Sequence, residues 1–168
     1  TGFRYGWIAL AAAASLAIAV GLVTRQRAAA ASIPDLVVAH VNGEEKPMLA
    51  LRTPVPSAEV KGAFADRGIQ LASIPVDVSY VAECPVGDYR TVHMVMPRDN
   101  EGVSVLYFPD YRVPSAREFS RGTQHGREVR IGGGTLVMLA ENAAVFDALE
   151  HTWRDALEGP VQSAAGSR

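Results

Sequence analysis

The feature that most constrains the fold is an uncharged apolar run near the start of the chain. From Trp7 to Val23 it contains no charged residue and no proline. With its neighbours it approaches the ~20 residues that a helix needs to cross a hydrocarbon core. We therefore expect a transmembrane helix at about residues 7–24, within a membrane anchor formed by residues 1–27. Its larger side chains are Trp7, Leu10, Leu16, Ile18, Val20 and Leu22.

The flanks of this run are typical of membrane interfaces. Three aromatic residues mark its start, at Phe3, Tyr5 and Trp7, and Arg25 and Arg27 follow it. A secretory signal peptide is the alternative, because residues 29–31 are alanines of the kind found at cleavage sites. The two arginines between the apolar run and these alanines argue against it. The predicted partners are therefore the lipid bilayer and, through the Ala/Gly-rich helix, other transmembrane subunits.

The rest of the chain predicts one small domain. The 168 residues allow a single compact domain beside the anchor. We expect a linker at 28–34, a soluble α+β domain at 35–158 and a flexible tail at 159–168. The net charge of -2 does not favour nucleic acid as a partner. A single cysteine excludes an internal disulfide framework.

Three helices are expected in this domain. The first spans residues 35–41. The second begins with Ser57 as N-cap and ends before Gly68, a typical C′ glycine. The third is capped by Asn142 and stopped at Gly159, and its apolar stripe is Val145, Phe146, Leu149, Trp153 and Leu157.

Alternating and apolar segments predict about five strands. They lie at residues 76–80, 91–96, 103–108, 127–131 and 135–140. Turns are expected at 84–88, 98–102 and 132–134, and a mobile basic connection at 111–125. Short connections indicate an antiparallel meander. The predicted fold class is α+β: one transmembrane helix, then an antiparallel sheet of about five strands with the helices packed on one face.

One cysteine and two histidines are the candidates for a metal site. Cys84, His93 and His40 lie on separate predicted elements, and a thiolate with two imidazoles suits a soft metal ion. Their spacing matches no standard metal-binding motif. In the alternative interpretation Cys84 is a small buried apolar residue, and His93 faces solvent or makes a hydrogen bond.

Two catalytic interpretations also fit short pieces of the sequence. Cys84 and His93 could form a nucleophile and base, but no orienting carboxylate is readable. Residues 132–134 are three glycines that could cradle a phosphate, but they lead into a strand, so a hairpin turn is favoured. We therefore predict a non-enzymatic protein with no cofactor and no small-molecule substrate.

A basic segment is the candidate interface. Arg112, Arg117 and Arg121 lie near Phe119, and acidic residues at 110, 118 and 128 dilute their charge. This composition favours a solvated or partner-facing surface over a nucleic-acid site.

Scattered short matches give the domain a resemblance. They are residues 38–41 with 44–45, Cys84-Pro85, residues 93–96, residues 103–106 with Pro109, and residues 134–137. With these segments the chain resembles an uncharacterised proteobacterial family of membrane proteins laid out like anti-sigma factors. The resemblance implies one membrane span and a periplasmic C-terminal domain. It implies no functional residues.

These observations lead to one functional prediction and two alternatives. The prediction is an accessory or interaction subunit of a bacterial inner-membrane assembly, such as a respiratory or photosynthetic complex. The domain would then be periplasmic, although the arginines flanking the helix favour a cytoplasmic one. One alternative is an anti-sigma-like transmembrane regulator. The other is a metal or redox site at Cys84 and His93.

Overall fold

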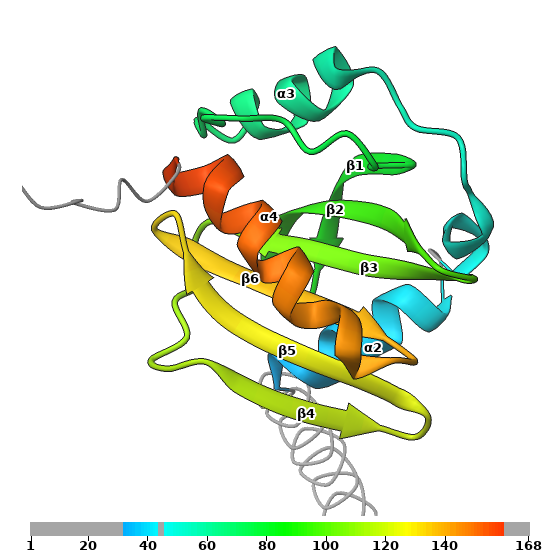
Figure 1. Ribbon diagram of the computed structural model, residues 1–168. Coiled ribbons are helices and arrows are strands. Elements are labelled where there is room, and N and C mark those ends of the chain that lie inside the picture. Colours follow the sequence, from blue (N-terminus) through cyan, green and yellow to red (C-terminus); the bar gives the residue numbers. More distant parts are fainter. Residues whose placement is uncertain (1–31, 44–45, 160–168) are drawn as a thin grey trace, which may run out of the picture. The chain divides into compact units, whose positions relative to one another are not determined.

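A computed structural model describes residues 32–43 and 46–159. Its centre is a six-stranded antiparallel sheet in the order β1-β2-β3-β6-β5-β4 (Figure 1). The strands are β1 (Tyr80–Val86), β2 (Tyr89–Arg98), β3 (Glu101–Phe108), β4 (Arg117–Arg121), β5 (Gln124–Ile131) and β6 (Gly134–Ala140).

The sheet consists of two three-stranded meanders. The first is β1-β2-β3 and the second is β4-β5-β6, and pairing of β3 with β6 joins them. The hairpin predicted at residues 132–134 is confirmed, since Gly132 and Gly133 turn with φ of +58° and +84°. Such angles suit glycine because it has no Cβ. The arrangement leaves β1 and β4 as the two edges of the sheet.

Three helices flank the sheet: α2 (Ile33–Gly43), α3 (Ser57–Ala65) and α4 (Phe146–Glu158). Two short 3₁₀ helices, η1 (Lys46–Ala50) and η2 (Ala143–Val145), accompany them. Helices α3 and α4 share a core with one face of the sheet, where Phe64 stacks on Trp153 at 5.6 Å between ring centroids. Helix α2 lies on the opposite face, behind the sheet in Figure 1.

Helices on both faces explain why the central strands are apolar throughout. Every residue of β6 is buried, and so are the six consecutive residues from Thr91 to Met96 of β2. On β2, Val92, Met94 and Met96 face α3 and α4. Thr91, His93 and Val95 alternate with them and so face the α2 side. A polar residue at these positions is therefore placed in the interior.

The helix ends test three sequence predictions. Gly68, with φ of +72°, is the C′ residue of a Schellman motif, because Ile69 N–H donates to Phe64 O and Gly68 N–H to Ala65 O. Asn142 is an N-cap, but it caps the 3₁₀ helix η2 that leads into α4, whose own N-cap is Val145. Ser57 is not a cap, since the N-cap of α3 is Pro56, which makes no side-chain cap hydrogen bond.

The Asn142 cap leads to a quantitative prediction. Its side-chain oxygen accepts from Ala144 N–H at 3.0 Å, at the start of the η2–α4 segment. Asn142→Ala should lower the free energy of unfolding by about 1 kcal/mol, because a backbone donor loses its partner. Urea unfolding measures this loss. Gln70→Ala, at an exposed loop position, is the control, and an equal loss in both variants would contradict the capping role.

The fold-class prediction was wrong in the number of strands and in the faces of the sheet that the helices cover. The sheet has six strands rather than about five, because residues 111–125 contain β4. This edge strand is mostly charged and exposed, so it lacks the alternation used to recognise strands. Residues 76–79 precede β1, whereas Cys84 to Val86 belong to it. The helices cover both faces, since residues 33–43 pack on the side opposite the terminal helix.

The predicted transmembrane helix receives no support from the structure. Residues 7–24, with the anchor side chains of Trp7, Leu10, Leu16, Ile18, Val20 and Leu22, lie outside the described residues. Among the residues that are described, no helix has the length and apolar character needed to cross a bilayer. The linker and tail predictions also fall largely outside the described part of the chain.

Candidate metal centre

The structure brings the three metal-ligand candidates together. His40 comes from α2, Cys84 from β1 and His93 from β2, and one ligand atom of each lies within 4.8 Å of the other two. No other such group of His, Cys, Asp or Glu occurs among residues 32–43 and 46–159. These three residues are 53 positions apart at most, so only the tertiary fold creates the cluster.

The pairing of β1 with β2 places two of the ligands. Cys84 pairs with Thr91, and His93 pairs with Ala82 two positions along. Because alternate residues share a face, Cys84 and His93 are diagonal neighbours on the α2 side of the sheet. Both are buried, with 6% of Cys84 and none of His93 exposed.

Helix α2 supplies the third ligand, from the face of the sheet opposite α3 and α4. Val37 and Val41 are fully buried and fix which side of α2 faces inward. His40 adjoins this side, and its ring meets the His93 ring edge to face, with 5.4 Å between centroids. The His40 Nε2 atom is buried and has no hydrogen-bond partner among the described residues. A buried polar atom in this state is costly unless something binds it.

The surroundings of His93 keep its imidazole neutral. Its pKa is lowered from 6.5 to about 3, mainly because burial disfavours the charged ring and secondarily because His40 lies nearby. Its Nε2 lies 3.1 Å from the Ser104 hydroxyl on β3. A neutral imidazole has a lone pair for a metal ion, and a hydrogen bond at the other nitrogen orients the ring.

Two neighbours of the cluster were not among the sequence candidates. Ser104 holds His93 from the adjacent strand, and the Tyr80 ring lies 5.6 Å from the His93 ring. A signal for Ser104 existed in the sequence. The turn at 98–102 fixes the β2–β3 register, and that register places Ser104 beside His93 on the same face.

Burial separates the metal interpretation from the nucleophile interpretation. A nucleophilic thiol must reach a substrate, and in the described structure Cys84 and His93 are covered by α2. A metal ion needs only the lone pairs of the three side chains. The geometry thus favours metal binding over covalent chemistry at Cys84.

The candidate interface residues contact other parts of the same domain. Arg117 pairs with the buried Glu128 on β5, and Arg121 pairs with Asp35 of α2 at 2.7 Å. Arg121 also lies over the Phe119 ring, and Arg112 is exposed. Their role as a docking surface for a membrane assembly remains a prediction.

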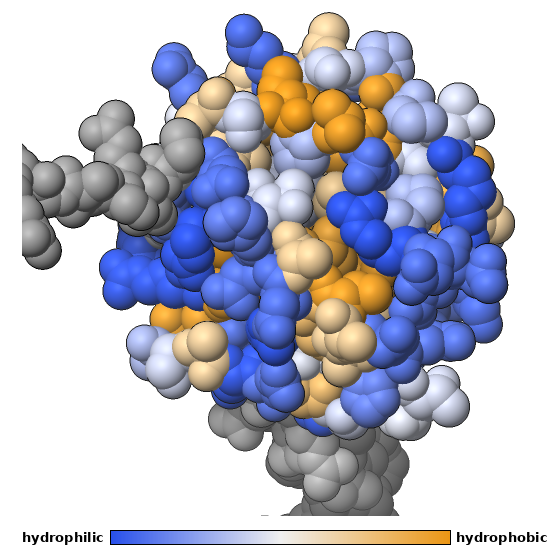
Figure 2. Space-filling model, in the orientation of Figure 1, coloured by the Kyte–Doolittle hydropathy of each residue, from blue (hydrophilic) through white to orange (hydrophobic). Residues whose placement is uncertain are grey.

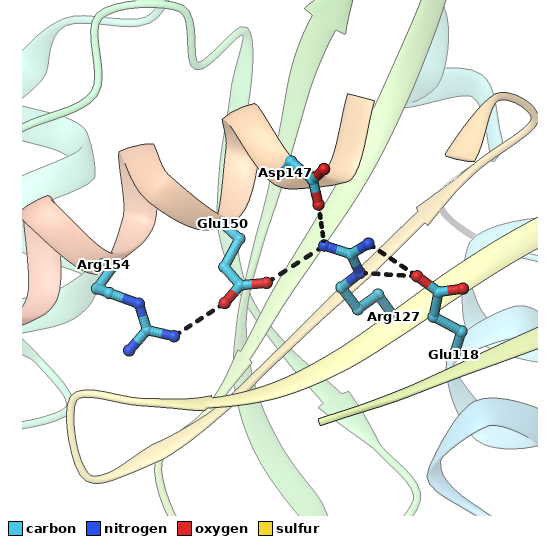
Figure 3. Close-up of polar contacts among 5 residues, drawn as sticks. All are labelled: Glu118, Arg127, Asp147, Glu150 and Arg154. Atoms are coloured by element: carbon cyan, nitrogen blue, oxygen red, sulfur yellow. Dashed lines mark hydrogen bonds and ion pairs between the residues drawn. The ribbon is translucent and has the colours of Figure 1, made fainter. Parts of the chain in front are cut away.

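A second charged cluster surrounds Arg127 and joins β5 to α4 (Figure 3). Arg127 pairs with Asp147 at 2.6 Å, Glu118 at 2.7 Å and Glu150 at 3.3 Å, and Glu150 also pairs with Arg154. These bonds raise the pKa of Arg127 further, with Asp147 as the main cause. Each charged side chain in the cluster has a partner of opposite charge within the domain, so the cluster links α4 to the sheet. The face of the molecule shown in Figure 2 carries hydrophilic residues around a smaller apolar area.

A family model matches residues 2–157, which is nearly the whole chain. The chain belongs to this family, described as protein of unknown function DUF3379. Neither curated proteins nor solved structures give a match. The DUF3379 description states no activity, so the anti-sigma-like resemblance stays a prediction and a function must be inferred from the His40, Cys84 and His93 cluster.

Proposed function

We propose that this domain binds one soft or borderline transition-metal ion through His40, Cys84 and His93. The observation that carries the proposal is the convergence of their three ligand atoms to within 4.8 Å. Atoms bound to one ion at about 2.0–2.3 Å lie about 3.3–3.8 Å apart. The longest separation therefore needs to close by only about 1 Å, within the reach of side-chain rotation.

The chemistry of the ligands supports the same conclusion. Thiolate and imidazole groups suit copper and zinc, whereas calcium and magnesium prefer oxygen. His93 is already neutral, and Ser104 supplies the hydrogen bond that commonly orients a metal-bound histidine. The buried Nε2 of His40 would gain a partner.

Metal binding in this position would join α2 to the sheet. One ligand belongs to the helix and two belong to β1 and β2. Two polar contacts between described residues tie α2 to the β4–β5 hairpin, and both are exposed: Arg121 with Asp35, and Asn42 with Gln124 at 2.9 Å. Exposed pairs contribute little to stability. The ion would thus be the strongest polar link between α2 and the sheet, and α2 would have to lift to admit it.

Metal content of the purified full chain tests the proposal. The apo protein, prepared with a chelator, is expected to take up about one Zn²⁺ or copper ion per chain, and to unfold at a higher temperature when loaded, because the ion binds only the folded state. Cys84→Ser and His40→Ala should each abolish stoichiometric uptake. Elemental analysis after dialysis gives the stoichiometry.

The control for this experiment is a histidine outside the cluster. His151 lies on α4 with 78% of its side chain exposed, so His151→Ala should bind metal like the wild type. Circular dichroism of the metal-free variants checks that each is folded. Wild-type protein without stoichiometric metal, or folded Cys84→Ser and His40→Ala variants that keep it, would refute the site.

A further inference from the structure

The charge of the ligand set distinguishes between the candidate ions. When all three residues coordinate, two imidazoles are neutral and the Cys84 thiolate carries one negative charge. The site with Zn²⁺ or Cu²⁺ would then carry a net charge of +1. The site with Cu⁺ would be neutral.

Because the cluster is buried, the difference in net charge between these complexes affects which ion binds. Of the three ligand residues, His93 is fully buried, Cys84 is 6% exposed, and the Nε2 atom of His40 is also buried. No Asp or Glu belongs to the group among the described residues, so no carboxylate there compensates an extra positive charge. The nearest acid in sequence, Glu83, alternates to the other face of β1 and pairs with Arg67 and Arg90. An uncompensated buried charge is strongly unfavourable.

The number of ligands favours the same ion. Structural Zn²⁺ sites have four protein ligands in a tetrahedron, and catalytic sites fill the fourth position with water. Among the described residues this cluster has three ligands, and Ser104, a hydroxyl on β3, is already paired with His93. Soft thiolate ligands select Cu(I). Cu(I) also accepts three ligands without the ligand-field cost that a missing fourth ligand imposes on Cu(II).

From charge, burial and ligand number we infer that the site is a three-coordinate Cu(I) site, selective against Zn²⁺. This inference rests on the metal-binding function proposed above and names its ion. The ion would be held by one sulfur and two nitrogens beneath α2. Such a site suits a protein that stores, transfers or senses cuprous ions, since it requires no further reaction at the metal.

Competition between the two ions tests the inference. The apo full chain is titrated without oxygen against a chelator that buffers Cu(I), and separately against one that buffers Zn²⁺. We expect the dissociation constant for Cu(I) to be at least about 100-fold lower than for Zn²⁺, because only the cuprous complex is neutral. X-ray absorption of the loaded protein should show one sulfur and two nitrogen ligands.

Three variants test whether Cu(I) binds at the cluster. His40→Ala should raise the dissociation constant for Cu(I) by at least about 10-fold, because a three-coordinate ion loses one of its ligands. His151→Ala should leave the constant unchanged. Cys84→Ser removes the only thiol of the chain and should abolish tight binding.

Each outcome has a defined meaning. If Zn²⁺ binds at the cluster as tightly as Cu(I), or in a four-coordinate site, the cuprous inference is overturned and the metal-binding proposal stands. If Cu(I) binds equally well to His40→Ala, the ion is held elsewhere and the inference is overturned. If neither ion binds the folded wild type, both proposals fail.

Discussion

Replacing Trp153 by alanine is expected to lower the free energy of unfolding by about 3–5 kcal/mol. Trp153 is fully buried at the centre of the face covered by α3 and α4. It stacks on Phe64 at 5.6 Å, and its indole N–H donates to Met96 Sδ at 3.1 Å. Alanine would leave a cavity between α4, α3 and β2. Since a domain of this size has only about 5–15 kcal/mol of stability, much of it would be lost.

Two further variants make this prediction specific. Trp153→Phe keeps an aromatic ring against Phe64 and should cost less than alanine, although it loses the contact with Met96. Leu51→Ala, at a position with 41% exposure, should change the stability by less than about 0.5 kcal/mol. Urea unfolding followed by circular dichroism gives all three values. Equal losses for Trp153→Ala and Leu51→Ala would show that Trp153 is not central to the core.

The helices around this core could be predicted because their signals are local. The residues of the α4 stripe recur at helical spacing, and Gly68 and Asn142 act through backbone groups within a few residues. Ser57 shows the limit of such signals. A residue type that favours the N-cap is present, but Pro56 occupies the cap and Ser57 is already the first residue of the helix.

The sheet was less predictable because its order depends on distant contacts. Strand β4 offers one apolar residue, Phe119, which packs against Gly126 of β5, where an added Cβ would lie 2.1 Å from the ring. Nothing within residues 117–121 indicates this pairing. The β3–β6 pairing, which joins the two meanders, likewise connects segments that are far apart in the sequence.

The metal cluster was partly predictable from the sequence. The residue types were readable, but His40, Cys84 and His93 match no standard spacing, so the sequence could not bring them together. The decisive facts are that α2 covers the face opposite α4, and that the β1–β2 register places Cys84 and His93 on that face. Packing both faces of the sheet therefore created the candidate site.

Metal-free protein is expected to lose stability in mild acid because of His93. Its pKa is about 3 when folded against an ordinary value of 6.5, so below pH 6.5 the unfolded chain takes up a proton that the folded chain refuses. The free energy of unfolding then falls by about 1.4 kcal/mol per pH unit, about 2 kcal/mol by pH 5 and at most about 5 kcal/mol near pH 3. This penalty is absent above pH 6.5.

Comparison with a neutral variant isolates this effect. Among the described residues, the groups known to face His93 are His40 from α2, Cys84 and Tyr80 from β1, and Ser104 from β3, and none of these four is a carboxylate. His93→Gln cannot titrate, so between pH 7 and pH 5 it should lose about 2 kcal/mol less than the wild type. Urea unfolding of both full chains in the presence of a chelator measures the difference. Parallel losses in the two proteins would mean that His93 is protonated in the folded domain, and that water reaches the cluster beneath α2.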